Sequence, residues 1–169
     1  MPEPRQHTQN RGVMESILRR IPGFRGYLEK EYRRESDALQ RELLSDCLVR
    51  AKRSLDDHTR ALVDAGDIDS MPQWDRVRLR IDKLSARIRG AMHGYSGWFD
   101  LVQIDETVLD RVYEHDVKLL DQVEQFSKSV EQLPAEKPGG ASKAPDMVAR
   151  LEQLEHMWDE REDILKGVD

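Results

Sequence analysis

Cysteine, glycine, proline and aromatic residues are all scarce in this chain of 169 residues. It holds one cysteine, ten glycines, seven prolines and ten aromatic side chains. A lone thiol, Cys47, excludes an intramolecular disulfide and a metal site built from several cysteines. Cys47 falls on an apolar row, so we expect a small core residue there rather than a nucleophile.

Long apolar runs are missing as well. No segment approaches the roughly 18 consecutive apolar residues of a membrane-spanning helix. The first twelve residues lack the apolar centre of a signal peptide. No glycine-rich loop joins a strand to a helix, so nucleotide binding has no support. Together with the single thiol, these absences predict a cytoplasmic protein, with peripheral membrane association left open.

Charge is abundant, but the two signs are unevenly distributed. Residues 1–98 carry 19 Lys/Arg and 15 Asp/Glu, whereas residues 99–169 carry 8 and 18. The net charges are therefore +4 and −10. We expect basic and acidic helices to lie side by side and to guide each other's packing. The arginine-rich segment 76–89 can track phosphate, but pairing with the acidic segment 110–124 is expected, so no nucleic-acid binding is predicted.

Apolar residues recur every three or four positions along most of the chain, which predicts an all-α fold. We expect helices at 13–21, 27–65, 70–94, 105–133 and 146–169, with Ser70, Asp105 and Asp146 as N-caps. Segment 1–11 is expected to be a disordered tail, and PAEKPGGASKAP at 134–145 a flexible linker. Residues 12–133 then form an antiparallel helical bundle or coiled-coil hairpin domain, followed by a separate C-terminal helix.

Unequal helix lengths leave part of this predicted hairpin uncovered. The short turn at 66–71 pairs helices 27–65 and 70–94 antiparallel, and the row from Trp74 to Ala91 faces its partner. The stretch from Leu28 to Leu43 then has no partner in helix 70–94. The N-terminal helix, the turn at 95–104, the C-terminal helix or a second copy must cover it. Because uncovered apolar stripes usually mark interaction sites, we predict a homodimer.

Two segments are candidates for binding a protein partner: an N-terminal segment that combines apolar with basic residues, and the turn at residues 94–99, which holds three aromatic side chains. Their candidate contact residues are Ile17, Arg20, Ile21, Phe24, Arg25, Leu28, Tyr32, Tyr95, Trp98 and Phe99. The N-terminal helix also suits an anionic membrane surface. Packing into the bundle core is the alternative for that helix, and plugging the bundle end is the alternative for the aromatic turn.

Few residues offer catalytic or metal chemistry. Asp116 lies on the apolar row between Val112 and Leu119, where we expect a buried carboxylate that fixes register by pairing with a basic side chain of helix 70–94. His156 is one turn from Glu152 and from Glu160, but we expect these three to form a solvated face. No Glu-x-x-His motif is present. We therefore predict no metal, no cofactor and no enzymatic activity.

The segments IPGFRGYLEKEYRRESD (21–37) and GYSGWFD (94–100) resemble small helical bacterial proteins of uncharacterised function. The layout of a short amphipathic helix before a long hairpin resembles that of phage-shock-type membrane-stress proteins in architecture alone. These resemblances imply no activity. The sequence favours a non-enzymatic interaction or scaffold protein that self-associates and binds an unidentified protein. A peripheral membrane-associated scaffold and a helical-bundle enzyme or metal carrier are the alternatives.

Overall fold

The computed structural model describes residues 4–27, 29–91, 106–134 and 142–167, except the side chains of residues 4–11, 30 and 106. Within these ranges the regular structure is helical and no β-strand occurs. In chain order the helices are α1 (Pro4–Arg20), α2 (Lys30–Asp64), α3 (Met71–Gly90), α5 (Glu106–Glu131) and α6 (Ala144–Lys166). The predicted all-α class is confirmed.

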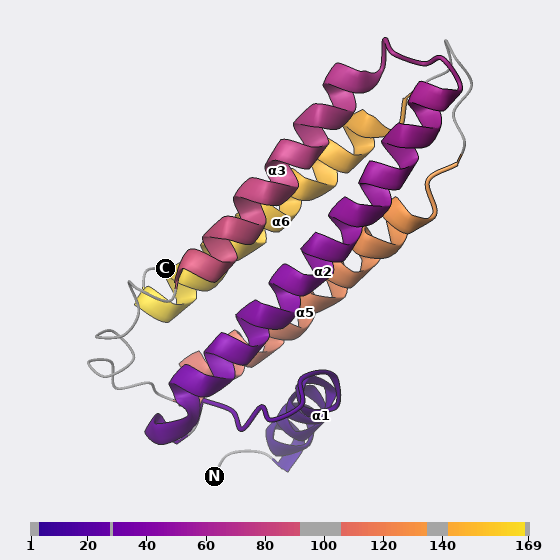
Figure 1. The fold of residues 1–169 in the computed structure, drawn as a ribbon. Helices are drawn as coiled ribbons and strands as arrows, with labels where there is room; N and C mark the ends of the chain where they lie inside the picture. The colour runs from indigo at the N-terminus through magenta and orange to yellow at the C-terminus, as the bar shows by residue number, and fades with distance from the viewer. Residues whose placement is uncertain (1–3, 28, 92–105, 135–141, 168–169) are drawn as a thin grey trace.

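Four of these helices form a long bundle (Figure 1). α2 packs against α3 and α5, and α6 packs against the same two helices from the opposite corner. α2 and α5 run in one direction, whereas α3 and α6 run in the other. The antiparallel pairing of α2 with α3 agrees with the short turn between them. We expected α6 to lie outside the bundle domain, but it is one of the four helices of the bundle.

Rows of apolar side chains, spaced by three and four residues, build the core of the bundle. The row predicted in α3 is buried from Trp74 to Ile88, with each member at most 1% exposed. Matching rows of α5 and α6 pack against it, including Leu119, Val123, Phe126, Leu151, Leu154 and Trp158. Each such side chain contributes about 1.5–3 kcal/mol when it leaves water. None of the described helices is long and apolar enough to cross a bilayer.

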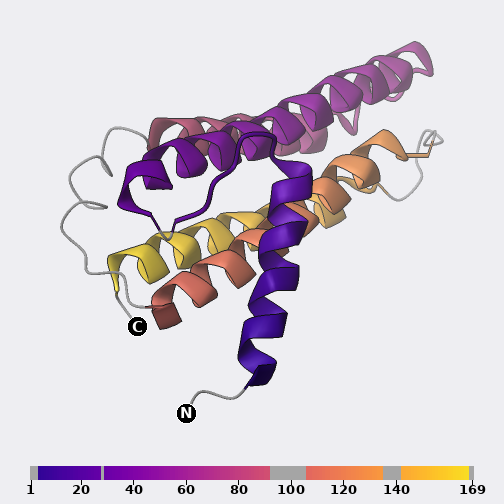
Figure 2. The same cartoon turned by 90° about the horizontal axis from the view of Figure 1, so that it is seen from below.

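α1 packs across α5 at a steep angle, on the outside of the bundle (Figure 2). It begins at Pro4 rather than at Val13, so most of the segment that we expected to be disordered is helical. Ile17, Ile21 and Phe24 are at most 3% exposed and share a second apolar cluster with residues of α5. For these three residues, core packing is the alternative that the structure adopts.

The first half of α2 is covered within the chain. Phe24 and Tyr27 belong to the second apolar cluster, against which Leu39 and Leu43 of α2 pack. The C-terminal part of α6 also reaches this level, because Arg161 contacts Asp37. Leu28 lies outside the described residues. The predicted gap therefore does not require a second copy of the chain, and self-association needs support from another surface.

The starts of α2 and α6 differ from their sequence predictions, whereas the N-cap position of α3 is the predicted one. α2 begins at Lys30 rather than at residue 27. Ser70 is the N-cap of α3, but its side chain makes no capping hydrogen bond, and its backbone N–H donates to Asp67 Oδ1 at 3.2 Å instead. α6 begins at Ala144, so Asp146 lies inside the first turn, where its charge suits the helix dipole. Asp105 lies outside the described residues.

Gly26 holds the segment between α1 and α2 in a backbone conformation that other residues rarely adopt. Its φ is +90°, and a Cβ atom there would lie 2.7 Å from the Tyr113 hydroxyl oxygen. Gly66, after α2, has a similar φ of +83°, but a Cβ atom there would meet nothing within 4 Å. The two glycines thus share a backbone requirement and differ in their surroundings.

We therefore expect Gly26→Ala to destabilise the fold more than Gly66→Ala. Both changes force a side chain into the left-handed region, at about 1–2 kcal/mol each. Gly26→Ala must also displace Tyr113, which adds about 1–3 kcal/mol of overpacking. Urea unfolding of both variants measures the difference. Equal losses would show that the close approach at Gly26 contributes nothing.

Candidate functional site

Polar residues interrupt the buried rows of three helices at one level of the bundle. They are Asp37 and Gln40 of α2, Asp116 of α5 and Arg161 of α6, and each is at most 2% exposed. Arg161 continues the buried row of α6 between Trp158 and Leu165. Charged side chains are almost never fully buried unless they are paired. We call these four residues, with Arg41 and Tyr27, the Arg161 cluster.

Arg161 joins α6 to both α2 and α5. Its Nε donates to Asp116 Oδ1 at 2.7 Å, and its Nη2 donates to Asp37 Oδ1 at 2.7 Å. Arg41 Nε donates to the other oxygen of Asp37, also at 2.7 Å. Arg41 Nη1 lies 3.4 Å from the carbonyl oxygen of Arg89, at the end of α3. Two carboxylates and two guanidinium groups thus balance in charge and connect all four helices.

Tyr27 connects the segment after α1 to the Arg161 cluster. Its hydroxyl oxygen lies 2.5 Å from Gln40 Oε1 and 2.9 Å from Asp116 Oδ2. Its backbone N–H donates to the Tyr113 hydroxyl at 2.5 Å, and the two rings stack with centroids 5.2 Å apart. The position of this segment and the position of α6 therefore depend on the same polar groups.

Burial and charge shift two pKa values in the Arg161 cluster. Burial, followed by the charge of Asp116, raises the pKa of Tyr27 well above its ordinary value. Burial alone would lower the pKa of Arg161, but the charges of Asp116 and Asp37 outweigh it and hold that pKa well above its usual range. The Tyr27 hydroxyl therefore keeps its proton and Arg161 keeps its charge.

Asp116 was correctly expected to be buried and paired with a basic side chain, but the predicted partner helix was wrong. The partner is Arg161 of α6 rather than a residue of α3, because α3 and α5 lie at opposite corners of the bundle. Arg161 itself was missed. A signal was available in the row Met147, Leu151, Leu154, Trp158 and Leu165, because position 161 completes its spacing of three and four.

The basic side chains of α3 also pair differently from the prediction. We expected them to meet the acidic residues of α5, but their described partners lie on α2 and α6. Arg80 lies 2.9 Å from Glu152 and 3.2 Å from Glu155, and Arg87 lies 2.5 Å from Asp159. Arg78 and Arg89 pair with α2, through Asp56 and Asp46. α3 and α6 are thus adjacent helices of opposite net charge.

The remaining predicted partner-binding residues have mixed locations. Arg20 pairs with Asp121 of α5, which ties α1 to the bundle. The guanidinium group of Arg25 lies 4.8 Å from the ring centroid of Tyr32. Tyr95, Trp98 and Phe99 lie outside the described residues. Among the described residues of the N-terminal segment, Ile17, Ile21 and Phe24 are buried, so its apolar side chains do not form an exposed surface.

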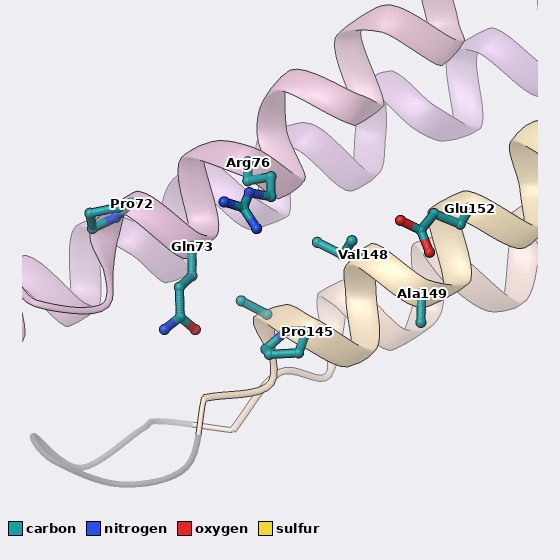
Figure 3. Close-up of a pocket in the computed structure, with 8 residues that line it drawn as sticks. Pro72, Gln73, Arg76, Pro145, Val148, Ala149 and Glu152 are labelled. Atoms are coloured by element: carbon teal, nitrogen blue, oxygen red, sulfur yellow. The ribbon is translucent and has the colours of Figure 1, made fainter.

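An apolar cleft opens between the first turns of α3 and α6 (Figure 3). Its volume is about 530 Å³. Its lining is Pro72, Gln73 and Arg76 from α3, with Ala144, Pro145, Val148, Ala149 and Glu152 from α6. Small apolar side chains and two prolines make most of this lining, and charges occur at Arg76 and Glu152. Such a lining suits apolar side chains from a partner.

The outer face of α3 continues from this cleft. Leu79 is 69% exposed, the largest fraction among the large hydrophobic side chains that the structure describes. Arg76 and Lys83, one turn to either side, are exposed and form no ion pair within the described residues. On the neighbouring face of α6, His156 lies 3.2 Å from Glu160 and both are exposed. Among the described residues, no three metal-ligating side chains gather.

Arg161→Met should lower the free energy of unfolding by about 3–5 kcal/mol, because it leaves two buried carboxylates with one guanidinium group. Adding Asp116→Leu should recover most of this loss, because Asp37 and Arg41 then remain as a balanced pair. Urea denaturation of the single and double variants tests both statements. A double variant no more stable than Arg161→Met would contradict the charge-balance explanation.

The free energy of unfolding should fall as the pH rises above about 10, the ordinary pKa of tyrosine. The pKa of Tyr27 is higher in the folded chain than in the unfolded one. The stabilisation that Tyr27 gives to the folded chain is therefore complete below about pH 10. It is lost as the pH rises through the pKa of Tyr27 in the folded chain. Tyr27→Phe should show a shallower decline in urea titrations between pH 9 and pH 11, by up to about 1.4 kcal/mol per pH unit. Parallel curves would refute this assignment.

Comparisons with models of protein families, with curated proteins and with solved structures found no match to this chain. Function must therefore be inferred from the contacts, charges and exposed surfaces of the chain itself.

Proposed function

We propose that this chain is a non-enzymatic helical interaction protein, which self-associates and binds a protein partner through the outer surface of its bundle. The observation that supports this most is the face formed by α3 and α6. There an apolar cleft of about 530 Å³ lies beside a leucine that is 69% exposed. Apolar surface surrounded by charge is the usual composition of a protein–protein interface.

The interior of the bundle supports the same proposal. The Arg161 cluster uses its charges to hold α2, α5 and α6 together and to place the segment after α1. A frame fixed in this way keeps α3 and α6 side by side. Rigid helix faces present binding residues at constant spacing, which lowers the entropy lost on association.

The N-terminal helix gives less support to the alternative of a peripheral membrane scaffold. Ile17, Ile21 and Phe24 would be its membrane-facing residues, and all three are buried against the bundle. Membrane insertion would first have to remove them from the core. The α3–α6 face needs no such rearrangement, so it is the surface that we favour.

Sedimentation velocity of the purified full chain from about 1 to about 100 µM tests the proposed self-association. We expect the sedimentation coefficient to rise with concentration from that of a monomer to that of a dimer. Raising the salt concentration should shift this transition upward, since charged groups lie around the contact. A monomer throughout the concentration range would reject self-association.

A further inference from the structure

We propose that the α3–α6 face is the contact surface of a symmetric homodimer, in which α3 of each copy packs against α6 of the other. The proposal depends on the self-association inferred above and adds the surface and the geometry. A two-fold dimer requires a face that is complementary to itself. The face joins a basic helix to an acidic one, which meets this requirement.

The outer row of α3 contains basic and apolar side chains that can contact an acidic helix. It contains Pro72, Arg76, Leu79 and Lys83, spaced by four, three and four residues, so these side chains share one side of the helix. Neighbouring Arg80 and Arg87 already pair with α6 of the same chain. Arg76 and Lys83 are exposed and have no ion pair within the described residues. Their charge is therefore available to a second copy.

The outer row of α6 offers the opposite charge. Glu152 and Glu160 lie one turn before and one turn after His156, and the side chains of both are about half exposed, at 55% and 49%. Existing ion pairs give the relative heights of the two helices. Arg80 is level with Glu152 and Glu155, and Arg87 is level with Asp159. Lys83 therefore lies at the height of the turn between Glu155 and Asp159, within about one turn of Glu160.

Charge selects one of the two possible symmetry axes. Two copies can meet face to face about an axis across the helices, which would place α3 on α3 and oppose like charges. They can also meet about an axis parallel to the helices, which places α3 on α6 of the other copy. Like charges across an interface are costly, whereas opposite charges steer and orient association. The parallel axis is therefore the favoured one.

The same arrangement places an apolar side chain at one end of the cleft. Leu79 precedes Arg80, so it lies at the height of Glu152 and one turn below Val148 and Ala149. With the axis parallel to the helices, Leu79 of one copy faces this end of the cleft of the other copy. Each dimer then buries two leucines, each against α6 of the other copy at the end of its cleft, which explains why the most exposed large hydrophobic side chain lies on this face.

Sedimentation equilibrium of single variants tests this interface, with circular dichroism to confirm that each variant is folded. Leu79→Asp should weaken the dimer by at least about 30-fold, because it places a charge in an apolar contact. Ile68→Asp is the matched control, since Ile68 is 67% exposed in the turn between α2 and α3. It should leave the dimer dissociation constant unchanged.

A charge reversal tests the pairing of helices. Lys83→Glu and Glu160→Lys should each weaken the dimer several-fold, and the double variant should recover most of the wild-type affinity. A wild-type dimer that Leu79→Asp leaves intact, or that Ile68→Asp weakens equally, would overturn the interface and leave self-association standing. A wild-type chain that is monomeric at about 100 µM would overturn both proposals.

Discussion

A guanidinium group inside an apolar bundle must be paired, and the pairing of Arg161 determines how four segments of this chain meet. Asp37 comes from α2 and Asp116 from α5, and both lie 2.7 Å from Arg161 of α6. A shift of α6 by one turn would remove Arg161 from both carboxylates and leave the buried charges of Arg161 and Asp116 unpaired, whereas Asp37 would keep Arg41. Apolar contacts alone tolerate such shifts more easily, because they have no direction.

The Arg161 cluster also explains why the segment after α1 is buried. Tyr27 places its hydroxyl among the charged groups, and its ring packs with Phe24 and Tyr113 beside them. Ile17 and Ile21 extend the same apolar cluster along α1. The N-terminal helix is therefore positioned by the interior of the bundle as well as by its contact with α5.

Periodicity in the sequence was sufficient to predict the helices but not their arrangement. The row from Trp74 to Ile88 is buried as expected, because a charged helix with one apolar face can bury only that face. Asp116 was recognisable as buried for the same reason. Its partner was not, because spacing along one helix carries no information about which helices become neighbours. Arg161 stood on a row of its own helix and could have been identified as a buried charge.

The surface is harder to predict from sequence for a related reason. Leu79 lies opposite the buried row of α3, and its exposure could be read from the helical period. The cleft beside it depends on the side-by-side placement of α3 and α6, which the linker and the charge pattern leave undetermined. The basic residues of α3 were accordingly assigned to the wrong acidic helix. Only the assembled bundle shows that basic α3 and acidic α6 share one face.

Native-state hydrogen exchange gives the most direct test that the Arg161 cluster couples α6 to the segment after α1. If it does, the Tyr27 amide and the amides around Arg161 should exchange with the same opening free energy, since one opening event exposes both. Arg161→Met should accelerate both sets together and leave the distant α2–α3 turn less affected. Exchange at Tyr27 that keeps its rate while the end of α6 opens would contradict the coupling.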